Sequence, residues 1–360
     1  MPNLLLNVPA ANVSKLTACL SGITLAAARG FYGVRCSAGM SNMPFSDLTI
    51  DVSGITSAVN AASDANLSKI SFLLNLGVKR NQAIADAWNS GTLWPVPNLP
   101  WTGVTSSMRN RICDEIIQLI VDTARAAAIA KGETPTTFLE FELLNEPGKD
   151  GNQEPVDSDG TFTTYPGLSN GQIHADYASM LDLVLTRVNF QSIPTISVTL
   201  EASGTTEATT EVNSISGATW TSVIGACTRI GFNRYADTIS PPYVEADVKS
   251  AFSTKDQAQV TRMVANAVIG SKAKSIREFG ITRGSNTGVG NRIPPCTHAN
   301  TIRTDLCEQM AVEANIQEAG LYCAYNWGSS EVAGDYGFYC YEESDNSPLV
   351  MFGSAVHITL

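Results

Sequence analysis

Histidine and charged residues are scarce in this sequence of 360 residues. Three histidines occur, and charged residues make up 16% of the chain, whereas 44% of the residues are hydrophobic. So large an apolar fraction is enough to build a buried core, which excludes an intrinsically disordered chain. The 23 basic residues are outnumbered by 34 acidic ones, and the net charge of −11 disfavours contact with the phosphate backbone of nucleic acids. We therefore expect a globular protein with no nucleic-acid partner.

The sequence also lacks an uninterrupted apolar stretch of about 18 residues, so it predicts no transmembrane helix and no membrane partner. The segment Lys15–Arg29 combines a basic residue with apolar and small residues, as a signal peptide does. Ser21, Gly22 and Thr24 interrupt this segment, and we interpret it as the first helix of the fold. Localisation and oligomeric state stay open, and action outside a cell or on a virus particle is compatible with the sequence.

Cysteine is too sparse for a disulfide scaffold, since the chain has eight cysteines and no Cys-x-x-Cys pair. Four of them lie within apolar patterns and are expected to be small core residues: Cys19, Cys36, Cys113 and Cys323. Three others fall in or near expected loops, where one disulfide stays an open alternative: Cys296, Cys307 and Cys340. We expect no metal site and no cofactor.

Strand-like and helix-like runs alternate along the whole chain, an order typical of parallel strands joined by helices. The expected strands are Asn3–Asn7, Phe31–Cys36, Lys69–Asn75, Thr137–Leu144, Thr195–Leu200, Thr238–Ser240, Ser275–Phe279 and Leu321–Asn326. The expected helices are Ala11–Ala28, Ile55–Ala65, Ser107–Lys131, Ile173–Val188, Thr219–Thr228, Lys255–Ile269 and Thr304–Ala319. This order predicts an α/β fold, a (β/α)8 TIM barrel that forms a single domain over residues 1–360.

Long segments follow several expected strands, among them Gly77–Thr105, Pro147–Gln172 and Ala202–Ser216. In a TIM barrel the loops at the carboxyl ends of the strands build the active site. Two expected strands end in glutamate at this face: Glu146 in the run Phe141–Pro147 and Glu278 in the run Ile276–Gly280. Two carboxyl groups about 5 Å apart are what hydrolysis of a glycosidic bond with retained configuration requires.

These motifs resemble those of glycoside hydrolase family 5 and its clan-A relatives, retaining enzymes that include cellulases and mannanases. The specific parts of the match are Phe-Glu-x-x-Asn-Glu-Pro at 141–147 and Glu-Phe-Gly at 278–280. The resemblance implies that Glu146 is the general acid/base and Glu278 the nucleophile. It also implies that the partner is a polysaccharide or an oligosaccharide. The long loops after the third, fourth and eighth expected strands predict an open groove for several sugar units, so we expect an endo-acting enzyme.

The resemblance implies further substrate contacts. Asn145 corresponds to the residue that binds the sugar 2-hydroxyl, or else it is a turn residue. Arg35 corresponds to the arginine that contacts the nucleophile, and the alternative is a structural ion pair with Glu142. Tyr243 corresponds to the tyrosine that orients the nucleophile, and the alternative is a tyrosine in a surface loop.

Aromatic side chains provide a second set of candidates. The resemblance makes Trp327 the platform beneath the sugar at the cleavage point. Trp88 and Trp94 share one expected loop with Trp101, and they either line further sugar sites or pack within the loop. Glu201, at the end of the fifth expected strand, either binds a substrate hydroxyl or amino group or caps the next loop.

The sequence departs from the family at two positions, because Gly77 and Pro241 stand where many members have histidine. Two other functions are compatible with the same fold, since fold alone does not establish catalysis. One is a carbohydrate-binding or structural barrel without activity, such as a component of a virus particle. The other is a transglycosylase, in which a sugar rather than water resolves the glycosyl-enzyme.

Overall fold

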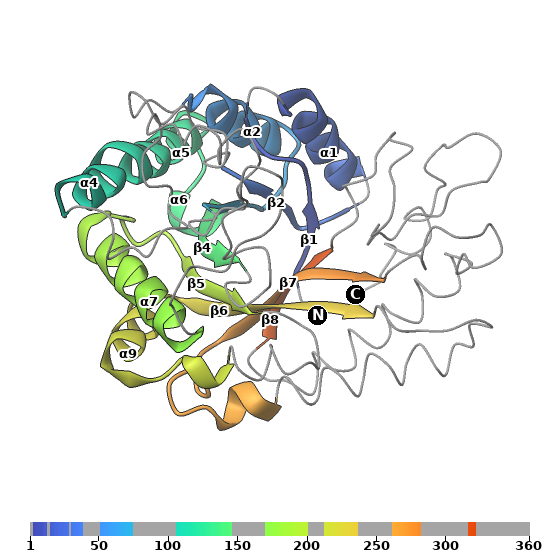
Figure 1. Ribbon diagram of the computed structural model, residues 1–360. Helices are drawn as coiled ribbons and strands as arrows, with labels where there is room; N and C mark the ends of the chain where they lie inside the picture. The colour runs from blue at the N-terminus through green and yellow to red at the C-terminus, as the bar shows by residue number, and fades with distance from the viewer. Residues whose placement is uncertain are drawn as a thin grey trace, which may run out of the picture.

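The computed structural model describes residues 3–12, 15–28, 30–38, 51–74, 106–145, 170–200, 212–236, 261–281 and 316–321 (Figure 1). Within these ranges, eight parallel strands form a closed barrel in which each strand pairs with the next along the chain. The circle closes where β8 pairs with β1, with Leu4 beside Ala319 and Leu6 beside Leu321. The α/β barrel expected from the sequence is confirmed.

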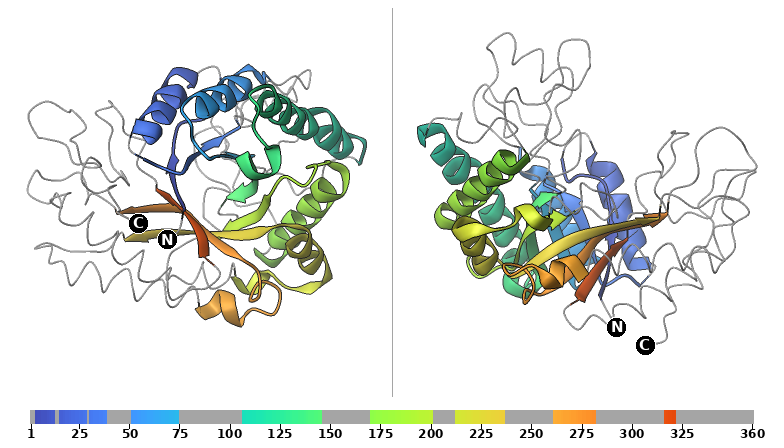
Figure 2. Two further views of the ribbon diagram at one scale, coloured as in Figure 1. Left: turned by 180° about the vertical axis from the view of Figure 1, so that it is seen from behind. Right: turned by 60° about the horizontal axis from the view of Figure 1, so that its bottom comes forward.

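The strands are β1 (Asn3–Asn7), β2 (Gly33–Ser37), β3 (Lys69–Leu73), β4 (Leu139–Asn145), β5 (Thr195–Leu200), β6 (Arg229–Ala236), β7 (Lys274–Ile281) and β8 (Ile316–Leu321). The helices are α1 (Leu16–Ala28), α2 (Ser53–Asp64), α4 (Ser106–Arg111), η3 (Ile112–Ile117), α5 (Gln118–Ala130), α6 (Pro135–Phe138), α7 (Asn170–Arg187) and α9 (Gly217–Ala226). The helices lie on the outside of the barrel, where α2 packs between α1 and α5 and α7 packs against α9 (Figures 1 and 2).

The expected position of the sixth strand is wrong. β6 occupies Arg229–Ala236 rather than 238–240, and residues 238–240 lie outside the described ranges. Glycine weakens a strand pattern because it contributes no side chain, and Gly231 interrupts the apolar alternation here. Only glycine fits at this position, because a methyl group on residue 231 would overlap the hydroxyl of Thr199 and the side chain of Arg277.

The expected eighth strand is also misplaced. β8 covers Ile316–Leu321, so the helix expected over Thr304–Ala319 is wrong at its carboxyl end. Gln317, Glu318 and Ala319 favour a helix locally. The strand forms because β1 and β7 both offer unpaired backbone groups to it, with Ile276 of β7 beside Ala319.

The helix expected over Ser107–Lys131 is present but not uniform. A π-helical segment, η3, separates α4 from α5. The wider turn places Ile112, Cys113, Ile116 and Ile117 all in buried positions.

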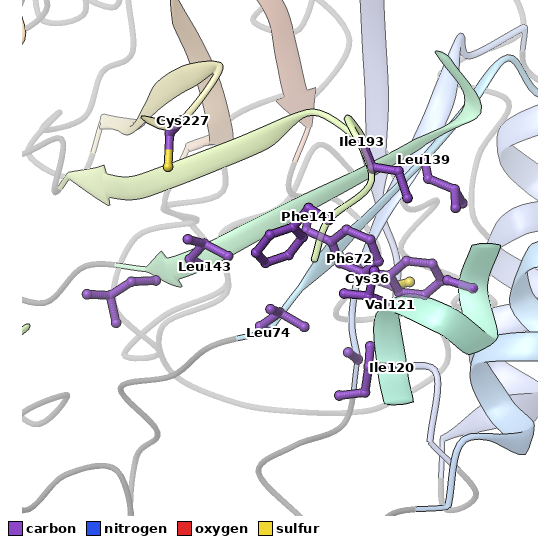
Figure 3. Close-up of a cluster of buried hydrophobic side chains, with 14 of the residues drawn as sticks. Cys36, Phe72, Leu74, Ile120, Val121, Leu139, Phe141, Leu143, Ile193 and Cys227 are labelled. Atoms are coloured by element: carbon purple, nitrogen blue, oxygen red, sulfur yellow. The ribbon is translucent and has the colours of Figure 1, made fainter. Parts of the chain in front are cut away.

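An apolar layer lies between the strands and the surrounding helices (Figure 3). Phe72 of β3 stacks on Phe141 of β4 with ring centroids 6.1 Å apart, and Phe190 packs against Phe141 at 5.8 Å. Figure 3 shows Ile120 and Val121 of α5 beside these rings. The layer joins the outer face of the sheet to the helices.

The buried cysteines belong to the same layer. The free, buried thiols in the described ranges are Cys19, Cys36, Cys113 and Cys227. The core positions expected for the first three are confirmed, whereas Cys323 and the three loop cysteines lie outside the described ranges. Burial raises the pKa of the Cys227 thiol to about 12, so this thiol stays protonated and unreactive.

The interior of the barrel is polar and charged. Alternate strand residues point inward and are buried, among them Arg35, Lys69, Ser71, Glu140, Glu142, Thr199, Arg229, Asn233 and Arg277. The bond from Arg277 of β7 to Ser71 of β3, 2.6 Å long, joins strands that are not neighbours and therefore crosses the interior. Most TIM barrels fill this space with branched apolar side chains. Here ion pairs fill it.

Candidate functional site

The carboxyl end of β4 is the centre of the candidate site. The strand is buried along its length as far as Leu144, and Asn145 is the first residue that is partly exposed. Glu146 comes directly after it and lies outside the described residues. The strand therefore brings Asn145 to the carboxyl end of the barrel.

Arg35 of β2 binds Glu142 of β4 through two hydrogen bonds inside the barrel. Its Nε donates to Oε2 at 2.6 Å, and its Nη2 donates to Oε1 at 2.7 Å. The ion pair with Glu142 that the sequence offered as an alternative is thus present. A contact between Arg35 and Glu278 stays a prediction, because the structure describes only the backbone of Glu278.

Strict alternation of side chains does not hold at this end of β4. The Nη2 of Arg35 contacts Glu142 at 2.7 Å and also lies 3.5 Å from the Oδ1 of Asn145, three residues further along. Two residues separated by an odd number would point to opposite faces of a regular strand. Leu143 and Leu144 both belong to the outer apolar layer, which brings Asn145 back to the inner face.

Asn233 of β6 is a site residue that the sequence reasoning missed. Its Nδ2 lies 3.3 Å from the Oδ1 of Asn145, so it joins the end of β4 to β6. The register between β6 and β7 shifts between Phe232 and Asn233, and after the shift Asn233 has Glu278 as its Cα partner. The signal that would have found Asn233 is the alternation Ile230-Gly231-Phe232-Asn233, once Gly231 is accepted within a strand.

Arg277 of β7 connects the two carboxylates of β4. It is fully buried, its Nε donates to Glu142 at 3.0 Å, and its Nη2 lies 3.0 Å from Glu140. The backbone carbonyl of Arg277 accepts a bond of 3.1 Å from Asn7 of β1. Glu140 also pairs with Arg229 of β6 and lies 3.4 Å from Lys69 of β3.

This network keeps both buried carboxylates ionised. Burial alone would raise the pKa of Glu140, but Arg277, Arg229 and Lys69, with a hydrogen bond from Ser71, lower it to about 2. Burial opposes ionisation of Glu142 as well. The two arginines beside that carboxylate and the hydroxyl of Thr199 nevertheless hold its pKa below the ordinary value.

The remaining candidates from the sequence lie outside the described residues: Trp88, Trp94, Glu146, Glu201, Tyr243 and Trp327. The corrected strand bounds alter the argument for two of them. Tyr243 comes seven positions after the end of β6 at Ala236, and Trp327 comes six positions after the end of β8 at Leu321. Neither residue directly follows its strand as described.

Two features of other protein classes are absent from the described part of the chain. No helix there has the length and apolar character that crossing a bilayer requires. In the same ranges, His, Cys, Asp and Glu side chains do not gather in groups of three or more that could hold a metal ion.

The sequence matches no family model and no curated protein. The fold is similar to that of solved structures. An endo-1,4-beta-mannanase from Rhizomucor miehei has a TM-score of 0.51 at 14% identity, over 89% of this chain and 86% of that one. A GH5-4 broad specificity endoglucanase from Clostridium acetobutylicum has a TM-score of 0.51 at 15% identity, over 93% and 91%. An endo-beta-1,4-mannanase from Thermotoga petrophila has a TM-score of 0.50 at 13% identity, over 99% and 76%.

Proposed function

We propose that this chain is a retaining glycoside hydrolase in which Glu146 is the general acid/base and Glu278 the nucleophile. The observation that carries the proposal is the bridge made by Asn233. Its amide lies 3.3 Å from Asn145, the neighbour of Glu146, and its Cα partner is Glu278. This contact supports the proposal that two glutamates 132 positions apart, 278 minus 146, act at the same end of the barrel.

The charge states of the other strand-four carboxylates support this choice of acid. A general acid must hold a proton near the working pH and release it in the reaction. Glu140 and Glu142 are fully buried and their pKa values are lowered by arginine neighbours, so neither holds a proton at neutral pH. Of the three glutamates at 140, 142 and 146, the last comes directly after β4 in the sequence, and it is the one that we propose as the acid.

In the proposed reaction, Glu146 protonates the leaving glycosidic oxygen while the Glu278 carboxylate attacks the anomeric carbon and breaks the bond to that oxygen. The product of this step is a glycosyl ester on Glu278. Glu146, now ionised, takes a proton from water, whose oxygen attacks the anomeric carbon and releases the sugar with its original configuration. Asn145 is suited to bind the 2-hydroxyl, since its amide is fixed by Arg35 and Asn233.

The similar solved structures suggest which substrates to test first, since two of them are endo-mannanases and one is an endoglucanase. We therefore propose soluble β-1,4-mannan and mixed-linkage glucan as the first panel, with reducing-end release as the readout. Endo action predicts a rapid fall in viscosity before monosaccharide appears. Added acceptor sugar that lengthens the products would instead indicate transglycosylation.

The decisive test uses Glu146→Ala and Glu278→Ala on aryl glycosides. Glu278→Ala should abolish turnover, whereas Glu146→Ala should keep activity on substrates with good leaving groups and gain activity with azide. The control is Glu115→Ala on the barrel's outer surface, where Glu115 pairs only with Arg111 among the described residues and activity should not change. Inverted product in NMR, or full activity of Glu278→Ala, refutes the assignment. Binding of glycans without hydrolysis would favour the inactive barrel.

A further inference from the structure

Glu142 holds three other strands at one point inside the barrel. Its carboxylate accepts two bonds from Arg35 of β2, at 2.6 and 2.7 Å, and one from Thr199 of β5 at 2.6 Å. A fourth bond, of 3.0 Å, comes from Arg277 of β7. Two charged groups and one hydroxyl saturate the carboxylate, which is fully buried. Its position is therefore fixed from three sides.

The two arginines lead from Glu142 to the two proposed catalytic positions. Arg277 immediately precedes Glu278 in β7. Arg35 also lies 3.5 Å from Asn145, which immediately precedes Glu146. Glu142 thus contacts Arg277, the residue before Glu278, and is joined through Arg35 to Asn145, the residue before Glu146.

We infer that Glu142 is a positioning residue that sets both the separation of Glu146 and Glu278 and the electric potential in which they titrate. The inference rests on the proposed function and goes beyond it by assigning a task to a residue that touches no substrate. Glu142 acts through Arg35 and Arg277.

The charges around Glu142 determine the direction in which the pH–rate profile should shift when Glu142 is neutralised. In the described residues the charged groups that contact Glu142 are Arg35 from β2 and Arg277 from β7. Glu140, on the same strand, shares Arg277 and pairs with Arg229 from β6 and Lys69 from β3. Four cations thus surround two carboxylates. Removing the charge of Glu142 makes the interior more positive, which stabilises the ionised form of any carboxylate nearby. Both limbs of the pH–rate profile should then move to lower pH.

The chain supplies a matched control in Glu140. It lies on the same strand and is equally buried and ion-paired, but its partners are Arg277, Arg229, Lys69 and Ser71. It is two residues, about 7 Å, further from the end of the strand. Glu140 shares Arg277 with Glu142, but among the described contacts none joins Glu140 to Arg35 or Asn145. Because of this and of its greater distance, Glu140→Gln should shift the pH profile less than Glu142→Gln does.

The experiment compares Glu142→Gln, Glu142→Asp and Glu140→Gln in pH profiles of kcat/KM for an aryl β-glycoside that the unaltered protein cleaves. Glu142→Gln should shift both limbs down by about one pH unit, the effect of a unit charge about 10 Å away at an effective dielectric constant near 20. Glu142→Asp keeps the charge but is too short to hold both arginines. The two limbs of its pH profile should therefore stay at the same pH values, while kcat falls about 10- to 100-fold.

The outcomes separate the two proposals. If Glu146→Ala and Glu278→Ala lose activity as proposed, but Glu142→Gln shifts the profile no more than Glu140→Gln, the inference is overturned and the proposed function stands. If the unaltered protein cleaves no glycoside, both fall together. Circular dichroism establishes folding of each variant. Should the Glu142 variants not fold, Thr199→Val removes one bond to Glu142 and keeps every charge, so kcat should fall at an unchanged profile, and an unchanged kcat refutes the inference.

Discussion

Replacing Glu140 by glutamine should make the barrel both less stable and less sensitive to acid. Glutamine has nearly the same shape but no charge, so Arg229, Arg277 and Lys69 would lose the carboxylate that they share. All of these groups are buried, and water cannot replace the lost partner. Breaking a buried ion pair from one side costs about 3–5 kcal/mol.

The pKa of Glu140 gives a second estimate of the same quantity. Its pKa falls from 4.5 to about 2 on folding, and at about 1.4 kcal/mol for each unit this is about 3 kcal/mol of folding free energy. Because the folded-state pKa is the lower one, the contribution is complete above pH 4.5 and is lost as the pH falls towards 2. At pH 3.5 about 2 kcal/mol should remain.

Urea unfolding at pH 7 and pH 3.5 measures the contribution of Glu140 to the free energy of unfolding at each pH. The difference in unfolding free energy between the unaltered protein and Glu140→Gln should be about 3 kcal/mol at pH 7 and about 1 kcal/mol smaller at pH 3.5. Glu115→Gln is the control, since Glu115 pairs with Arg111 on the surface and should change little. A difference that is the same at both pH values, or absent at pH 7, would show that Glu140 is not held ionised by its neighbours.

Two further predictions concern packing. Gly231→Ala should destabilise the protein by about 3 kcal/mol, because a methyl group has no room beside the buried side chain of Arg277, and urea unfolding measures the loss. An unchanged midpoint would contradict the crowded interior. Phe141→Ala should cost about 3–5 kcal/mol, since the ring packs against Phe72 and Phe190. A loss below about 1 kcal/mol in the same assay would mean that the outer layer repacks freely.

The barrel could be predicted from the sequence because its strands and helices have different apolar periods. The sequence predicts β1 and β5 at their observed bounds, and β7 within two residues, since each contains a short apolar run. β6 and β8 could not be placed from local pattern. Gly231 weakens one strand, and the other is formed from residues with helical preference whose neighbours in the sheet supply the missing hydrogen bonds.

The candidate site was predictable only in part. Arg35 and Asn145 are candidates because of the family resemblance, and the structure brings the Nη2 of Arg35 to 3.5 Å from the Oδ1 of Asn145. Asn233 was missed together with its strand. Arg277 was read as part of a motif, although its partners on β3 and β4 lie more than 130 residues away in sequence. No local pattern indicates contacts that cross the inside of a closed barrel.

The ion pairs inside the barrel also bear on the order in which the chain folds. Glu140 and Glu142 belong to the first half of the chain, yet Arg229 and Arg277, which neutralise them, are 89 and 135 residues further on. A nascent chain that ends after β5 has two acidic side chains facing inward with Lys69 and Arg35 alone to balance them. Such a half-barrel can pack its apolar outer face against helices, but its inner face has few partners until β6 and β7 arrive. Closure of the ring is thus the step that neutralises the interior, and folding should be cooperative across the whole barrel rather than proceed by stable halves.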